Sequence, residues 1–112
     1  MKRVEAIIRP ERLEAAKEAL IGLGHNGLTV CEVKGHGTQK GIKQQWRGEE
    51  YVIDLLPKVS LTAVVHDHEV QDVVDAITKA ARTDRIGDGK IFVSSVEQVI
   101  RVRTGETGPD AL

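Results

Sequence analysis

The sequence predicts a two-layer α+β fold in which two helices cover one face of a four-stranded antiparallel sheet. Two observations lead to this class. A strand–helix–strand pattern occurs twice along the chain, and residues 36–57 between the two patterns carry no clear apolar stripe. We therefore expect a single domain over residues 1–112, with a long loop at about 36–57.

The first pattern occupies residues 4–34. Residues 4–8 are predicted to form a strand that ends at Arg9, because a residue before proline is pushed toward extended geometry. Residues 11–23 show helical periodicity, and the glycines after them precede a second strand at residues 28–34. The residues expected to face the core from this helix are Leu13, Ala16, Leu20 and Leu23.

The second pattern begins with a clean alternation over residues 58–65. Asp67 is predicted to cap the helix that follows, and residues 91–96 are predicted to form the fourth strand. Residues 99–103 are a candidate short fifth strand, and residues 105–112 are expected to be a loose tail. The predicted core-facing residues are Val59, Leu61, Ala63 and Val65 from the strand, and Val70, Val73, Val74, Ile77 and Ala81 from the helix.

Two such units in tandem predict a ferredoxin-like βαββαβ sandwich. Its second sheet face has no helices to cover it. Apolar residues are expected there, partly exposed in a monomer, so we expect self-association. These residues are Ile7, Val33, Val64 and Phe92.

The composition excludes several classes of protein. The net charge of −1 gives no overall attraction to nucleic acid or to anionic lipid. No apolar run is long enough for a membrane span or a signal peptide, so a cytoplasmic protein is expected. The single cysteine, Cys31, lies in an apolar run and is predicted to be a buried, reduced thiol.

The segment at residues 36–57 combines glycines and cations with two of the three aromatic residues, Trp46 and Tyr51. Segments of this length in compact domains are often functional, which favours a mobile binding loop. The alternative is an extended hairpin in which residues 51–56 lengthen the third strand.

A candidate anion site lies at the turn formed by Gly87, Asp88, Gly89 and Lys90. Backbone N–H groups of a glycine turn bind phosphate when cations converge on it, and Arg101 and Arg103 follow on one face of an extended segment. The alternatives are an ordinary turn and a solvated edge strand. No Walker A or Rossmann glycine motif is present.

A second candidate site lies at the base of the loop. Gly37 and Gly41 permit close backbone approach, Gln39 offers an amide, and Lys40 and Lys58 supply positive charge. The alternative is an ordinary polar loop with a snorkelling lysine. A metal site at His66-Asp67-His68 is not favoured, because no partner ligand has suitable spacing.

Taken together, these segments resemble the PII nitrogen-regulatory signal-transduction family. The strongest motif is residues 83–93, Thr-Asp-Arg-Ile-Gly-Asp-Gly-Lys-Ile-Phe-Val, which resembles the C-terminal signature of the family. The order of Gln39-Lys40-Gly41, of Arg47-Gly48 before Tyr51, and of Leu56-Pro57-Lys58-Val59 also fits, and the resemblance runs from residue 5 to residue 106.

The resemblance implies a homotrimer with ATP or ADP bound in clefts between subunits. With ATP and Mg²⁺, it implies that 2-oxoglutarate binds at the loop base, with Gln39 on the metal side and Lys58 paired with a carboxylate. The implied nucleotide-binding residues are Ile7, Thr29, Gly37, Thr38, Gln39, Val64, Gly87, Asp88, Gly89, Lys90, Arg101 and Arg103. Those implied for 2-oxoglutarate are Gln39, Lys40, Gly41, Ile42, Lys58 and Gly87.

The resemblance also implies that the loop changes shape with the bound ligand and that partner proteins recognise this shape. The implied partners are an ammonium channel, a nucleotidyltransferase, or an enzyme or regulator of nitrogen metabolism, with contacts through Trp46, Arg47 and Tyr51. Membrane contact is expected only through a channel, and nucleic acid is not an expected partner. Tyr51 matches the nucleotidylation site, while Glu49 excludes a seryl phosphorylation.

Thr38 departs from the family pattern, in which an arginine usually contacts the nucleotide phosphates, so the preference for ATP over ADP stays open. His36 replaces a usual aromatic residue. An adenylate-only regulator that does not sense 2-oxoglutarate is the alternative function.

Other classes of protein are disfavoured. An acylphosphatase-like enzyme needs a phosphate-cradling loop after its arginine, and no such glycine-rich loop follows Arg9. An RNA-binding sheet needs stacking aromatics, and only Phe92 is available on the strands. The phosphate-binding residues argue against a metal-tolerance relative of the same topology. We therefore expect a regulator and not an enzyme.

Overall fold

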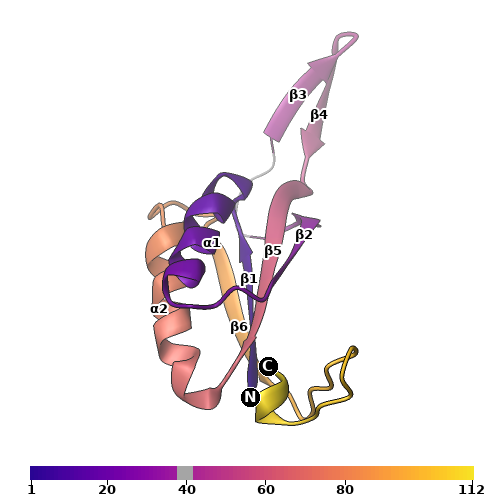
Figure 1. Ribbon diagram of the computed structural model, residues 1–112. Coiled ribbons are helices and arrows are strands. Elements are labelled where there is room, and N and C mark those ends of the chain that lie inside the picture. Colours follow the sequence, from indigo (N-terminus) through magenta and orange to yellow (C-terminus); the bar gives the residue numbers. More distant parts are fainter. Residues whose placement is uncertain (38–41) are drawn as a thin grey trace.

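The computed structural model describes residues 1–37 and 42–112, with the backbone alone described at 42–45 and 50–53. The main sheet has four antiparallel strands in the order β2-β5-β1-β6, and helices α1 and α2 lie together on one side of it (Figure 1). The elements are β1 (Lys2–Ile8), α1 (Leu13–Gly22), β2 (Leu28–Gly35), β5 (Leu56–Val65), α2 (Val70–Ala81) and β6 (Gly89–Ser95). This confirms the predicted ferredoxin-like α+β fold.

The segment between β2 and β5 forms a hairpin of its own. β3 (Ile42–Trp46) pairs with β4 (Glu49–Ile53) in a separate two-stranded sheet, which projects beyond the end of the main sheet (Figure 1). The hairpin alternative is therefore correct for the backbone. The lengthening of the third strand that belonged to this alternative is found only at Leu56 and Pro57, because β4 pairs with β3 and β5 begins at Leu56.

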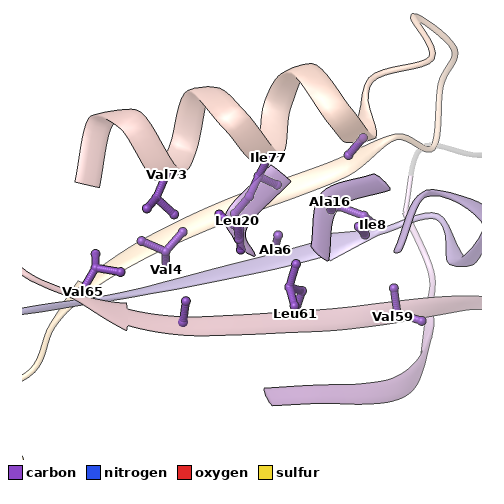
Figure 2. Close-up of a cluster of buried hydrophobic side chains, with 12 residues drawn as sticks. Val4, Ala6, Ile8, Ala16, Leu20, Val59, Leu61, Val65, Val73 and Ile77 are labelled. Carbon is purple, nitrogen blue, oxygen red and sulfur yellow. The ribbon is translucent and has the colours of Figure 1, made fainter. Parts of the chain in front are cut away.

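The core lies between the sheet and the two helices (Figure 2). Alternate residues of a strand point to opposite faces, so the predicted alternation in β5 gives one row of buried side chains. Leu61, Leu20 and Ile77 meet there with at most 1% of their surfaces exposed. The buried residues of the cluster are Val4, Ala6, Ile8, Ala16, Leu20, Val59, Leu61, Ala63, Val65, Val73, Ile77 and Ala81.

Most of the predicted helix stripe is confirmed, with Leu13, Val70 and Val74 packed on the edge of the core. Leu23 is an exception, since 45% of its surface is exposed. The reason is that α1 ends at Gly22, and the chain turns away from the sheet before Leu23 reaches the core.

The cap predicted before α2 is also wrong. Glu69, not Asp67, supplies the capping carboxylate, because Glu69 Oε1 accepts a hydrogen bond of 3.0 Å from the His66 N–H. His66 precedes a short 3₁₀ turn, η2 (Asp67–Glu69), and Glu69 is its last residue. Asp67 instead accepts a hydrogen bond of 2.8 Å from the Met1 ammonium group.

The C-terminal segment is folded, so the prediction of a loose tail is wrong. A 3₁₀ turn, η3 (Pro109–Ala111), ends the chain and buries Ala111, which is 7% exposed. The predicted strand at residues 99–103 is also wrong, because only an isolated bridge joins Ile100 to Thr107. Backbone bonds within the segment replace strand pairing, including Gly105 N–H to Arg101 O at 2.8 Å.

The sheet face opposite the helices carries the predicted apolar residues. Ile7, Val33 and Val64 are half-buried, and Phe92 is 52% exposed. Cys31 lies on the same face of the edge strand β2, opposite Ser60 of β5, and is exposed. Its predicted burial is therefore wrong for the single chain, because the apolar run in β2 alternates between the two faces.

Candidate functional site

An open cleft with a volume of about 510 Å³ lies at the end of the sheet where the hairpin begins. The antiparallel register brings its walls together, because Ile8 pairs with Gly89 and Gly35 pairs with Leu56. The turn between α2 and β6 forms one wall. The lining residues are Ile7, Gly35, His36, Gly37, Leu56, Lys58, Arg85, Gly87, Asp88, Gly89, Lys90 and Phe92.

Two glycines give this turn its backbone shape. Gly87 has φ of 102° and Gly89 has φ of 99°, in the region that side-chain-bearing residues rarely adopt. Gly89 also lies against β1, since a Cβ atom added there would stand 1.7 Å from the Ile7 carbonyl oxygen. The close approach of the turn to the strand therefore requires glycine at this position.

Between the glycines, Asp88 ties the turn to its own beginning. Its Oδ2 accepts hydrogen bonds from the N–H groups of Thr83 at 2.7 Å and Asp84 at 2.9 Å. Its Oδ1 accepts one from the Thr83 hydroxyl and one from Arg9 Nε at 3.0 Å. The hydrogen bonds from Thr83, followed by those from Arg9 and Asp84, hold the pKa of this carboxyl well below its usual range.

Arg9 is a site residue that sequence reasoning missed. Its side chain is nearly buried, with the residue 9% exposed, and it binds the turn twice. Nε donates to Asp88, and Nη2 donates to the Ile86 carbonyl at 2.7 Å. An arginine just after an apolar strand was a signal available in the sequence, but it was considered only as the end of that strand and as the arginine of an acylphosphatase-like enzyme.

Lys58 approaches the same turn from β5. Its Nζ donates a hydrogen bond of 2.7 Å to the Gly87 carbonyl. Partial burial, and then the nearby Arg9 guanidinium, lower the pKa of the Lys58 ammonium. Arg9, just after β1, and Lys58 of β5 therefore hold the carbonyls of residues 86 and 87, and Lys90 adds an exposed third cation beside Ile7.

The structure brings together only part of the predicted site. The predicted residues that line the cleft are Ile7, Gly37, Lys58, Gly87, Asp88, Gly89 and Lys90. Thr29 and Val64 instead pair with Thr62 and Arg3, toward the opposite end of the sheet.

The two arginines lie at that opposite end as well. β6 runs away from the cleft, and the Val96 N–H that follows it donates to the Met1 carbonyl at 3.1 Å. Arg101 pairs there with Glu106 at 3.6 Å, and Arg103 is exposed. The prediction that Arg101 and Arg103 converge on the glycine turn of their own chain is therefore wrong, because the full length of β6 separates the arginines from the turn.

Four predicted residues, Thr38, Gln39, Lys40 and Gly41, lie outside the described residues. Ile42 begins β3 and Tyr51 lies in β4, but the structure does not describe their side chains.

The hairpin turn is described. Trp46 is 60% exposed, and the Arg47 guanidinium lies over its ring at 4.3 Å from the centroid. Arg47, with φ of 51°, and Gly48, with φ of 79°, make the tight turn between the strands. An exposed Trp stacked with a cation is accessible to a partner, and its use as a contact stays a prediction.

Among the side chains that the structure describes, those of residues 1–37, 46–49 and 54–112, no group of three or more His, Cys, Asp or Glu could hold a metal ion. His66 and His68 stack with ring centroids 5.8 Å apart and have no further ligand that completes such a group. Within the same described residues, no helix is long and apolar enough to cross a membrane.

The two-layer sandwich, with a cationic glycine-turn cleft beside a projecting hairpin, defines a small domain of the ferredoxin-like α+β class. Comparison with known proteins then gives the family. The family model described as nitrogen regulatory protein P-II matches residues 1–106, and the chain belongs to this family of signalling regulators.

Relatives from several bacteria match along the whole chain. The chain is 59% identical over 112 residues to the nitrogen regulatory protein P-II of Rhodobacter capsulatus, with 100% of both chains covered. It is 57% identical to the protein of that name from Rhizobium meliloti and 54% identical to the one from Azospirillum brasilense, again over all of both chains.

Proposed function

We propose that this P-II protein binds ATP or ADP and, with Mg-ATP, also 2-oxoglutarate, and that it controls a partner protein through its hairpin. The observation that carries the proposal is the position of the cleft. A glycine turn and the cation Lys58 meet at the base of the projecting hairpin (Figure 1), so a ligand in the cleft would touch the sheet and residues 35–37, which lead toward the hairpin.

The residues of the cleft fit a phosphate group. Gly87 and Gly89 have positive φ, as in the glycine turns whose backbone amides bind anions, and their N–H groups would donate to the phosphate. Lys90 adds an exposed charge at the rim, and the Asp88 carboxylate is occupied by four donors, which reduces its repulsion of an anion. Gly87, Gly89 and Lys90 would hold the phosphates, with Ile7 beside them for the apolar part of the nucleotide.

The base of the hairpin suits a dicarboxylate. Lys58 already donates to a carbonyl oxygen of the turn, so its ammonium can bind a carboxylate at the same place. A bound Mg²⁺ would reduce the repulsion between a triphosphate and this acid. Gln39 would serve the metal side, and Lys40, Gly41 and Ile42 would supply loop contacts, as the family resemblance implies.

A second copy of the chain would complete the site. Residues at both ends of the sheet are needed, and these ends are about 20 Å apart along a strand of this length. A neighbouring subunit in a homotrimer would bring Thr29, Val64, Arg101 and Arg103 to the cleft of its partner. The helix-free face with Phe92 would then be covered by association.

The hairpin would contact the partner protein. Trp46 and Arg47 are exposed at its turn, and Tyr51 in β4 is the residue for a covalent nucleotidylation. The partner would be an ammonium channel, a nucleotidyltransferase, or an enzyme or regulator of nitrogen metabolism. The family is one of regulators, and we propose no catalytic step for this chain.

Isothermal titration calorimetry tests this function directly. ATP is titrated into the full-length protein with Mg²⁺, and 2-oxoglutarate is titrated with and without ATP. We expect 2-oxoglutarate to bind only when Mg-ATP is present. Binding of ATP without any binding of 2-oxoglutarate would favour an adenylate-only regulator, and binding of neither would refute the proposal.

A further inference from the structure

The turn that carries the proposed anion site is held from behind by one side chain, that of Thr83. The residue follows the end of α2, and its hydroxyl makes two contacts at once. The hydroxyl donates to Asp88 Oδ1 and accepts a hydrogen bond of 3.3 Å from the Arg85 N–H. The Thr83 N–H adds a third bond, to Asp88 Oδ2 at 2.7 Å.

We propose that Thr83 is a positioning residue for the anion site, which acts by fixing Asp88 and through it the glycines on either side. This inference rests on the proposed function, because it concerns the same cleft.

The geometry of the turn explains why such a clamp is needed. Three residues of the segment have positive φ, namely Asp84 at 66°, Gly87 at 102° and Gly89 at 99°. Such conformations persist only when surrounding contacts over-determine them. Asp88 lies between the two glycines, so fixing its carboxylate restricts the backbone amides that would face a phosphate.

The negative charge of Asp88 also affects the binding of an anion. A free carboxylate in an anion site would repel the ligand, and this one lines the cleft. An ionised carboxylate has about four acceptor positions, and four donors occupy them here: two from Thr83, one from Asp84 and one from Arg9. The hydrogen bonds from Thr83, first among the causes, lower the pKa of Asp88, so the carboxylate stays ionised with its charge held by these donors.

Among the four donors, the Thr83 hydroxyl is the one that a conservative change removes cleanly. Two of the other three are backbone N–H groups, which survive any substitution except proline. Arg9 also binds the Ile86 carbonyl and lies beside Lys58, so its removal changes more than one contact. Thr83→Val keeps the side-chain shape and removes the hydroxyl, whereas Thr83→Ser keeps the hydroxyl.

The test compares these two variants with wild type by ATP titration in full-length protein with Mg²⁺. We expect Thr83→Val to raise the Kd for ATP about tenfold, the scale of one hydrogen bond to a charged group, and Thr83→Ser to stay within about threefold of wild type. Thr78→Val is the matched control. Its hydroxyl donates to the Val74 carbonyl within α2. The residue lines a hollow on the helix side of the turn together with Asp88 and Gly89, but its hydroxyl bonds to α2 and not to the turn, so ATP binding should be unchanged.

Amide hydrogen exchange of the ligand-free proteins gives a readout that does not depend on nucleotide. Thr83→Val should speed exchange at residues 84–89 and leave β1 and β5 unchanged, and Thr83→Ser should restore protection. If wild type binds ATP and Thr83→Val binds it equally well, the positioning role is refuted while the proposed function stands. If wild type binds no nucleotide, the proposed function fails, and unchanged exchange in Thr83→Val then refutes the clamp as well.

Discussion

Gly89→Ala should be among the most damaging small substitutions in the chain. The new Cβ would stand 1.7 Å from the Ile7 carbonyl oxygen, whereas real Cβ atoms essentially never come under 3.0 Å of such an atom. The start of β6 must therefore move away from β1. The positive φ costs about 1 kcal/mol for an alanine, and loss of one or two ladder hydrogen bonds adds about 1 kcal/mol each. We expect a total loss of about 3 kcal/mol in the free energy of unfolding.

The assay is urea unfolding followed by circular dichroism, at one fixed protein concentration because self-association changes apparent stability. Gly105→Ala is the matched control. Gly105 also has positive φ, at 74°, but nothing lies within 4 Å of a Cβ atom added there. It should lose only about 1 kcal/mol. Equal losses in the two variants would show that the contact with Ile7 does not constrain the turn.

Three further predictions concern the site. Lys58→Met should abolish 2-oxoglutarate binding by calorimetry while ATP still binds, because it removes only the cation that pairs with the carboxylate; retained 2-oxoglutarate affinity would contradict the assignment. Arg103→Ala should weaken the binding of both ATP and ADP without changing the oligomeric state measured by light scattering. A titration with unchanged nucleotide affinity would exclude Arg103 from the binding site. Asp88→Asn should be less stable than wild type near pH 7 and less sensitive to acid. The reason is that a carboxyl whose folded pKa is depressed stabilises above its unfolded pKa, near 4, and loses that contribution as the pH falls through the folded value. If the free energies of unfolding of this variant and wild type, measured with urea, change by the same amount between pH 2 and 7, the role of the carboxylate is contradicted.

The elements that the sequence predicted well are those with a strong period. β5 alternates cleanly, and its four apolar residues form the middle of the core. α2 has a polar face opposite its stripe, so both its existence and its orientation followed from spacing. Where the pattern weakened, prediction failed. Residues 99–103 contain alternating apolar and cationic residues, but backbone bonds with residues 105–108 decide their structure, and such bonds have no periodic signature.

The site was predictable in composition but only partly in geometry. Glycines and lysines at the turn and at the loop base marked the cleft, since they are unusual residues for a compact domain to gather. Arg9 was missed because its partners, Asp88 and Ile86, lie nearly eighty positions away in the sequence. A contact of that kind depends on the register of β1 against β6, which hydrophobic pattern does not specify.

The separation of the predicted site into two groups is itself informative. Ile7, Lys58 and Lys90 lie at one end of the sheet, while Arg101 and Arg103 follow the other end of β6. No bend of a paired strand brings those ends together without breaking its ladder, since every residue of β6 pairs with β1. If both groups bind one nucleotide, the arginines must come from another chain. The proposed function therefore makes nucleotide binding depend on assembly, and dissociated subunits should lose affinity for ATP in a calorimetric titration even with every residue of the cleft intact.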